Sequence, residues 1–164
     1  MTSTHSSAQS PSASDRRTAW LLVLGQFVLL ALIVLLPRGT LWTFPVAVDH
    51  ATQIAAAAGI VLMLVAATAL GRGLTAAPLP NSHAELRTGG LYRLVRHPIY
   101  SGLLLLAVAL TVTSGSLWTT TACLALVTLI NAKARWEERH LAERFPDYAA
   151  YAARTPRFIP GLGR

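Results

Sequence analysis

The sequence predicts an all-α, polytopic membrane protein with four membrane segments: two spans and a short helical hairpin, followed by a cytoplasmic C-terminal helical extension. Hydrophobic residues make up 53% of the 164 residues and charged residues only 13%. The mean hydropathy of +0.48 is too high for an ordinary soluble domain. Three runs, 18–37, 50–71 and 98–132, carry no formal charge. The first two are long enough to cross the hydrocarbon core as helices, which takes about 20 residues.

Residues 1–17 are expected to form a disordered tail ahead of a single domain that covers 18–164. The tail is rich in Ser, Thr and Ala and holds almost no large apolar residue. The run 18–37 is longer than the apolar core of a typical signal peptide, so it is expected to remain as the first span. Its polar residue Gln26 should face another helix rather than lipid.

The run 50–71 is predicted to form the second span. Its first half is rich in alanine, from Ala55 to Ala58, and continues into Gly59. Such small residues let another helix approach closely. The segment ends at Gly71, and 74–88 is expected to be an irregular linker because it contains two prolines.

The run 98–132 is predicted to form the helical hairpin. Its middle is broken by Ser114-Gly115-Ser116, and each half is too short to span comfortably at about 1.5 Å per helical residue. The second arm is expected to continue past Asn131 into the cytosol. A gap between this hairpin and the alanine-rich second span should open sideways into the bilayer.

The distribution of charge predicts the orientation and the partners. Of the 14 basic residues, only Arg38 falls on the proposed far side, so both termini are expected to be cytoplasmic. The net charge of +7 favours a membrane surface rather than nucleic acid as the partner, because the basic residues flank apolar runs. A single cysteine, Cys123, excludes an internal disulfide and a cysteine zinc cluster. No metal site is expected.

The stretch from Gly89 to Gly102 is predicted to form a fixed corner at the membrane face. Its glycine pair permits a tight turn. Pro98 disfavours the α conformation at His97 and can itself begin a helix. Arg96 and His97 should therefore sit in a non-helical corner. A basic loop that only orients the protein in the membrane is the alternative.

An acidic pair, Glu137-Glu138, lies on the helix that extends from the hairpin. A solvated helix face with salt bridges is the ordinary explanation for such a pair. However, the pair is expected on the same membrane face as Arg96 and His97. A pocket between them would present carboxylates, guanidinium, imidazole and aromatic rings, which suit a zwitterionic ligand with an aromatic ring, such as S-adenosylmethionine.

The order of these motifs resembles the isoprenylcysteine carboxyl methyltransferase family, part of a wider group of small membrane methyltransferases that includes phospholipid methyltransferases. The similarity covers 78–160. It consists of G-x-Y-x-x-x-R-H-P-x-Y-x-G from Gly90, an apolar hairpin, E-E-x-x-L from Glu137, F-x-x-Y-x-x-Y from Phe145, and a proline-rich tail.

The resemblance implies a helical membrane enzyme whose S-adenosylmethionine pocket opens to the cytosol. The family position that faces the prenylcysteine carboxylate is Lys133 here, where arginine is usual, and Arg135 could substitute for it. Lysine cannot bind a carboxylate in the same two-pronged way. The catalytic set expected from this comparison is Arg135, Lys133 and Arg96. The expected cofactor contacts are Tyr92, His97, Pro98, Ile99, Tyr100, Glu137 and, beside it, Glu138.

The resemblance and the cofactor chemistry together predict the reaction. The most favoured activity is carboxyl methylation of a lipophilic, isoprenylcysteine-like substrate, with membrane lipid around it. A carboxylate acceptor needs no general base, whereas an amine or thiol acceptor must lose a proton to His97 or Glu138. The alternatives are N- or S-methylation of a phospholipid or other small molecule, a non-enzymatic membrane protein of the same fold, and a membrane reductase that uses NADPH.

Overall fold

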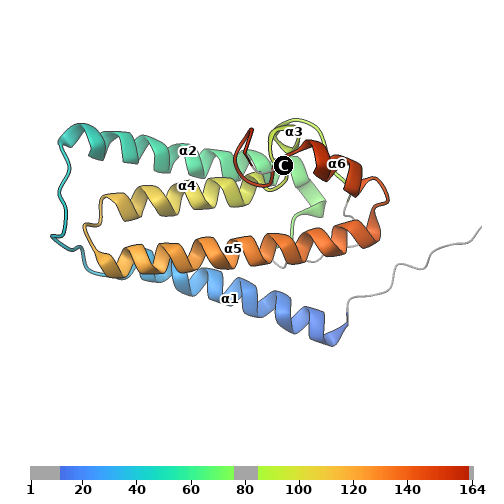
Figure 1. The fold of residues 1–164 in the computed structure, drawn as a ribbon, viewed down its shortest axis with the longest axis horizontal. Helices are drawn as coiled ribbons and strands as arrows, with labels where there is room; N and C mark the ends of the chain where they lie inside the picture. The colour runs from blue at the N-terminus through green and yellow to red at the C-terminus, as the bar shows by residue number, and fades with distance from the viewer. Residues whose placement is uncertain (1–11, 76–84, 163–164) are drawn as a thin grey trace, which may run out of the picture.

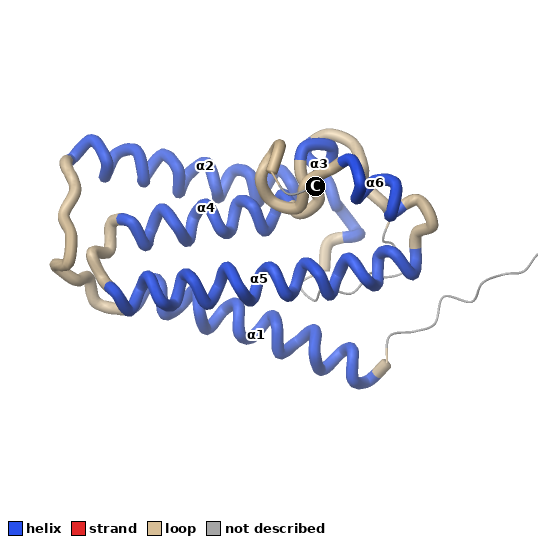
Figure 2. Tube along the Cα trace, in the orientation of Figure 1, coloured by secondary structure: helices blue, strands red, loops and turns tan. Residues whose placement is uncertain are grey.

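A computed structural model describes residues 12–75 and 85–162, and this part of the chain is built from helices joined by loops (Figures 1 and 2). The only strand-like feature within it is an isolated bridge between Ile159 and Leu162. The elements are α1 (Ala13–Leu35), α2 (Val46–Leu70), the short 3-10 helix η1 (Gly71–Gly73), α3 (Leu91–Leu94), α4 (Pro98–Val112), α5 (Leu117–Arg144) and α6 (Tyr148–Arg154).

Three of these helices, α1, α2 and α5, are long and apolar enough to cross a membrane, whereas α4 has 15 residues. The prediction of an all-helical fold is confirmed for the described residues, and three helices are candidate membrane spans. The predicted count of four membrane segments stays a prediction. The break at 114–116 separates α4 from α5, and α5 continues without interruption past Asn131, as predicted. The second arm of the hairpin is thus a helix of 28 residues, so only the first arm is short.

The first helix begins earlier than the sequence predicted. The disordered tail was expected to extend to residue 17, but α1 begins at Ala13, so that prediction is wrong for 12–17. Ser12 and Asp15 form a capping box, in which the Ser12 hydroxyl accepts a hydrogen bond from Asp15 N at 3.1 Å and the Asp15 carboxylate accepts one from Ser12 N at 3.2 Å. This reciprocal pair satisfies free N–H groups at the helix start. Residues 1–11 lie outside the described part of the chain, as does most of the predicted linker.

The helices pack in pairs, α2 on α4 and α1 on α5 (Figure 1). The α2–α4 contact centres on Gly59 and Gly102. A Cβ atom on Gly59 would lie 2.6 Å from the carbonyl oxygen of Gly102, and one on Gly102 would lie 2.5 Å from that of Gly59. The close approach predicted at Gly59 is therefore confirmed. The predicted sideways gap between the hairpin and the second span is wrong, because the two glycines let the backbones touch there.

The loops at one end of the bundle tie the two helix pairs together. Gly39 N donates a hydrogen bond to Ser114 O at 2.8 Å, and Leu41 N donates one to Gly115 O at 3.1 Å. The indole N–H of Trp42 donates to the Val112 carbonyl at 2.8 Å. The opposite end of the bundle carries α3, α6 and the C-terminal tail (Figure 1). The charged and aromatic residues of the predicted site lie at this second end.

Candidate active site

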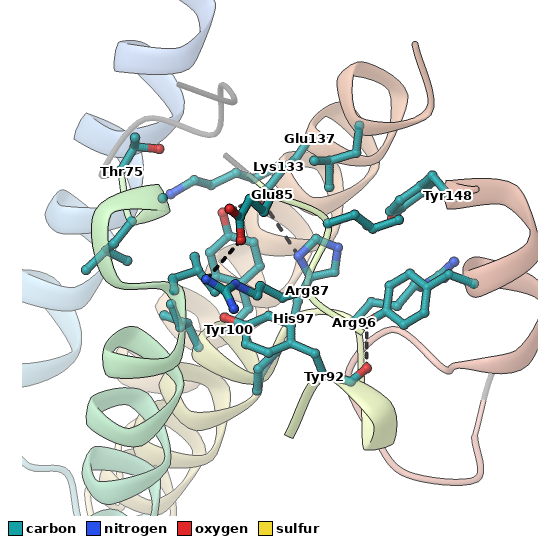
Figure 3. Close-up of a pocket in the computed structure, with 18 of the residues that line it drawn as sticks. Thr75, Glu85, Arg87, Tyr92, Arg96, His97, Tyr100, Lys133, Glu137 and Tyr148 are labelled. Atoms are coloured by element: carbon teal, nitrogen blue, oxygen red, sulfur yellow. Dashed lines mark hydrogen bonds and ion pairs between the residues drawn. The ribbon is translucent and has the colours of Figure 1, made fainter. Parts of the chain in front are cut away.

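A cavity of about 380 Å³ lies where α1, the end of α2, α3, the start of α4, α5 and α6 meet (Figure 3). This volume is within the range of small-molecule pockets, which is about 300–1,000 Å³. Polar and apolar side chains both line it, and the apolar residues Val23, Phe27 and Leu70 come from helices that are long and apolar enough to cross a membrane. The polar and aromatic lining residues that bear on function are Gln26, Glu85, Arg87, Tyr92, Arg96, His97, Tyr100, Lys133, Glu137, Tyr148 and Tyr151.

The corner predicted around Pro98 is present and forms one wall of the cavity. Gly90 has φ 59°, a conformation that favours glycine, and it immediately precedes α3 as its N-cap. His97 has φ −127° and ψ 65°, outside the helical region, and Pro98 is the first residue of α4. The C-terminal tail holds this corner, because Arg96 N donates to Pro156 O at 2.9 Å and His97 N donates to Arg157 O at 3.1 Å.

Glu138 is the centre of an internal ion-pair network. Its oxygens accept hydrogen bonds from Arg157 Nε at 2.9 Å and Nη2 at 2.7 Å. His97 Nε2 lies 3.1 Å from Glu138 Oε1, and Arg96 Nε lies 3.4 Å from the same oxygen. The hydrogen bond with Glu138 raises the pKa of Arg157 above its usual value. Glu138 was predicted to contact the cofactor, but its side chain is not part of the cavity lining. Its oxygens already have protein partners.

Glu137, in contrast, lines the cavity, with its side chain 27% exposed. The Tyr100 hydroxyl donates to Glu137 Oε2 at 2.9 Å, and His97 Nδ1 lies 3.8 Å from the same oxygen. The rings of His97 and Tyr100 are stacked, with centroids 5.3 Å apart. The two neighbouring glutamates therefore differ in role, because one residue step turns a helix by about 100°.

Lys133 also lines the cavity, one turn before Glu137, and is only 3% exposed. Its ammonium group donates to Gln26 Oε1 at 2.7 Å, so the prediction that Gln26 faces another helix is confirmed. The ammonium lies 5.2 Å from the centroid of the Tyr100 ring. Arg135, the predicted substitute for Lys133, is exposed and is not among the residues that line the cavity. Arg135 is two positions after Lys133, and residues two positions apart on an α-helix are about 200° apart around its axis. Arg135 therefore lies on a different face of α5.

Three tyrosines from α3 and α6 form an aromatic wall. The Tyr151 hydroxyl donates to the Tyr92 carbonyl, and the Tyr92 hydroxyl donates to the Ala66 carbonyl at 3.3 Å. The rings of Tyr148 and Tyr151 meet edge to face, with centroids 6.0 Å apart. Burial raises the pKa of Tyr151 to about 12, and it raises the pKa values of Tyr92 and Tyr148 as well. All three phenols are therefore neutral at physiological pH.

The residues that line the cavity fit S-adenosylmethionine. Glu137 can accept hydrogen bonds from an ammonium or from ribose hydroxyls, and the aromatic wall can pack against adenine or the sulfonium. Two buried polar atoms, Arg96 Nε and the Tyr148 hydroxyl, have no hydrogen-bond partner among the described residues. Arg96 Nε still has an ion-pair partner, Glu138 Oε1 at 3.4 Å. Buried polar groups are normally paired, so a polar ligand is the natural partner for the Tyr148 hydroxyl.

The structure brings together most of the residues predicted for the site. The lining includes Tyr92, Arg96, His97, Pro98, Ile99, Tyr100, Lys133 and Glu137, and it leaves out Arg135 and Glu138.

Sequence reasoning missed several participants, including Tyr148 and Tyr151 of the aromatic wall. Arg157, which holds Glu138, comes from the proline-rich tail, where a single arginine after Pro156 is a weak signal. Glu85 and Arg87 line the cavity as an exposed ion pair of 3.1 Å, and nothing in their local sequence marks them as site residues.

Comparison with known proteins adds two findings. A family model described as phospholipid methyltransferase matches residues 49–148. The cobalt-zinc-cadmium resistance protein CzcN of Cupriavidus metallidurans is 44% identical over 78 residues, which are 47% of this chain and 36% of that relative. The match thus covers about a third of the length of that relative. No solved structure matches the chain.

Proposed function

Because the chain belongs to the phospholipid methyltransferase family, a group of small membrane methyltransferases, we propose that it transfers a methyl group from S-adenosylmethionine to a lipophilic acceptor at the membrane face. The observation that carries this proposal is the placement of Lys133 and Glu137 one helical turn apart in a single cavity. That cavity is lined both by polar and aromatic side chains and by apolar ones. A charged cofactor and a lipophilic acceptor can therefore meet in it.

The polar and aromatic lining residues would hold the cofactor. Glu137 would bind its ammonium group or ribose hydroxyls, Arg96 its carboxylate, and the tyrosine wall its adenine. The bound cofactor supplies an activated methyl group on a sulfonium. The task left to the protein is to align the acceptor with that group and to exclude water.

The apolar lining residues of α1 and α2 would hold the acceptor. They are Val23 and Phe27 of α1 and Leu70 at the end of α2. These two helices are not packed on each other, since α1 lies on α5 and α2 lies on α4. An apolar tail would therefore extend between α1 and α2 toward the bilayer, which replaces the route past α4 expected from the sequence.

The preferred acceptor is an isoprenylcysteine-like carboxylate, which would become a methyl ester. The buried cation of Lys133 supports this choice, because it can hold a carboxylate at the end of the cavity next to α1. A carboxylate needs no general base for the transfer.

A phospholipid amine is the second candidate, and the description of the matching family favours it. An amine acceptor must lose a proton. His97 is a candidate base in the cavity wall, with its Nδ1 3.8 Å from the Glu137 carboxylate. Glu138, the other base suggested by the sequence, is occupied by Arg157.

Two experiments test the proposal. Calorimetry of the purified protein should detect binding of S-adenosylhomocysteine and not of NADPH. Absence of the first would favour a non-enzymatic protein of the same fold, and binding of NADPH alone would favour a reductase.

Methyl transfer from labelled S-adenosylmethionine should then be measured with a farnesylcysteine analogue, with phosphatidylethanolamine and with short water-soluble thiols. Base-labile label on the first supports the ester. Base-stable label on the lipid supports the amine. Activity confined to the thiols would contradict a lipophilic acceptor.

A further inference from the structure

Gln26 on α1 holds the ammonium group of Lys133 on α5 at the wall of the cavity. The hydrogen bond of 2.7 Å from Lys133 Nζ to Gln26 Oε1 joins residues 107 positions apart in the sequence. Both side chains line the cavity. The contact connects two helices that are long and apolar enough to cross a membrane. Polar and charged residues in such helices are costly and usually have a function.

The charge of Lys133 is not neutralised by a direct ion pair. Within 12–75 and 85–162, the acidic groups that form ion pairs do so with other partners, and none pairs with Lys133. Glu137, one turn along α5, accepts a hydrogen bond from Tyr100. The Tyr100 ring stabilises the ammonium through its π face but adds no negative charge. A buried cation is costly unless an anion lies near it, and the Glu137 carboxylate, beyond ion-pair distance, offsets the burial of Lys133 only in part.

The partner of Lys133 is a neutral amide, and this detail decides what the pair can do. An ammonium group has three N–H donors, and one of them is used by Gln26. A glutamate at the same position would neutralise the cation, whereas glutamine orients it and leaves its charge available to a ligand. We propose that Gln26 is a positioning residue that presents Lys133 to an anionic group on the methyl acceptor.

This inference rests on the proposed methyltransferase function and names the charge of its acceptor. The carboxylate of the cofactor is the other anionic group that Lys133 could bind. The surroundings favour the acceptor, because Val23 and Phe27 line the cavity on the same stretch of α1. A molecule with an apolar tail and an anionic head matches this wall, and the cofactor has no such tail. Gln26 lies outside the region 49–148 that the family model matches, whereas Lys133 lies within it, so that match covers only one of the two partners.

The test uses the purified full chain and two ligands that differ only in charge, N-acetyl-S-farnesylcysteine and its carboxamide. Binding of each is measured with S-adenosylhomocysteine present. The parent protein should bind the acid about tenfold more tightly than the amide, or better. Gln26→Glu, which places a carboxylate against Lys133, should remove this preference. It should not change the affinity for S-adenosylhomocysteine.

Two further variants keep the test independent of folding. The double variant Gln26→Leu/Lys133→Met removes both polar partners together, which an apolar environment tolerates, and it should also lose the preference for the acid. Gln53→Leu removes an exposed glutamine of α2 and should behave like the parent.

Equal binding of acid and amide by the parent, or a preference that survives in Gln26→Glu and in the double variant, would overturn the inference. The proposed function would stand in that case if S-adenosylhomocysteine still binds. A parallel loss of affinity for S-adenosylhomocysteine in Gln26→Glu would assign Lys133 to the cofactor and would also overturn it. Failure of the parent to bind S-adenosylhomocysteine would instead refute the methyltransferase proposal itself.

Discussion

Arg157 binds both oxygens of Glu138, with Nε to Oε1 at 2.9 Å and Nη2 to Oε2 at 2.7 Å. This two-pronged contact attaches the C-terminal tail to α5. Glu138 also meets His97 at 3.1 Å, so the tail, α5 and the corner before α4 share one carboxylate. Through this contact, a residue outside the cavity holds the wall of the cavity in place.

Arg157→Gln should therefore weaken both stability and cofactor binding. It leaves the half-buried carboxylate of Glu138 without its two charged hydrogen bonds, at a cost of about 1.5–3 kcal/mol. Arg157→Lys keeps the charge but loses the two-pronged geometry, so its effect should be intermediate. Thermal unfolding and calorimetry with S-adenosylhomocysteine measure the two effects. Arg154→Gln, at an exposed position on α6, is the control. An equal effect of this substitution would mean that the contact between Arg157 and Glu138 is not responsible for the loss.

Glu137→Gln should reduce the affinity for S-adenosylhomocysteine by roughly tenfold to a hundredfold. The substitution preserves shape but removes the ionic hydrogen bond that the cavity carboxylate offers, which is worth about 1.5–3 kcal/mol. Calorimetry of the purified variant checks this expectation. The same substitution at the exposed Glu143 of α5 should change little. If Glu137→Gln binds as tightly as the parent, the carboxylate serves only its contact with Tyr100.

Gly102→Ala should destabilise the protein by about 1–3 kcal/mol, since the added Cβ would lie 2.5 Å from the Gly59 carbonyl oxygen. The two backbones would have to separate, and the start of α4, which carries Tyr100, would move with them. A lower melting temperature is the expected observation. Gly89→Ala is the matched control, because a Cβ there meets nothing within 4 Å. Equal melting temperatures for the parent and Gly102→Ala would mean that the contact is not close in solution.

Stability should fall as the pH rises from 10 to about 12. Burial raises the pKa of Tyr151 from 10.0 to about 12. The neutral phenol is therefore favoured in the folded state. The contribution of the neutral Tyr151 phenol to the free energy of unfolding is complete below pH 10, and it is lost as the pH rises through the pKa of the folded state. Tyr151→Phe, which lacks both the hydroxyl and its hydrogen bond to Tyr92, should show a shallower decline of melting temperature. The same decline in both proteins would mean that this hydroxyl is not responsible.

Both termini should be accessible from the cytoplasm, and the loop 39–44 should be accessible from outside. The expectation follows from the basic residues, of which only Arg38 lies near that loop. Reporter tags at each terminus and within the loop measure the three locations. A C-terminal tag found outside would place the α5–α6 end of the cavity away from cytosolic cofactor and would contradict the proposed site.

The sequence alone was sufficient for features that depend on neighbouring residues. The apolar runs predict helices because hydrophobic side chains stabilise a helix in lipid wherever it packs. The corner before α4 was predictable because Gly90 and Pro98 act through their own backbone angles. The early start of α1 at Ala13 was missed, although the capping pattern Ser12–Asp15 that produces it is also local.

The tertiary structure alone decided which residues meet across the chain. Only the fold pairs α2 with α4 through Gly59 and Gly102, and thereby closes the route that the sequence left open. The fold also gives Glu137 and Glu138 different partners: Glu137 lines the cavity, and Glu138 binds Arg157. The physical reason is that a helix turns by about 100° per residue. Adjacent residues with the same chemistry therefore meet different partners, and those partners come from distant parts of the sequence.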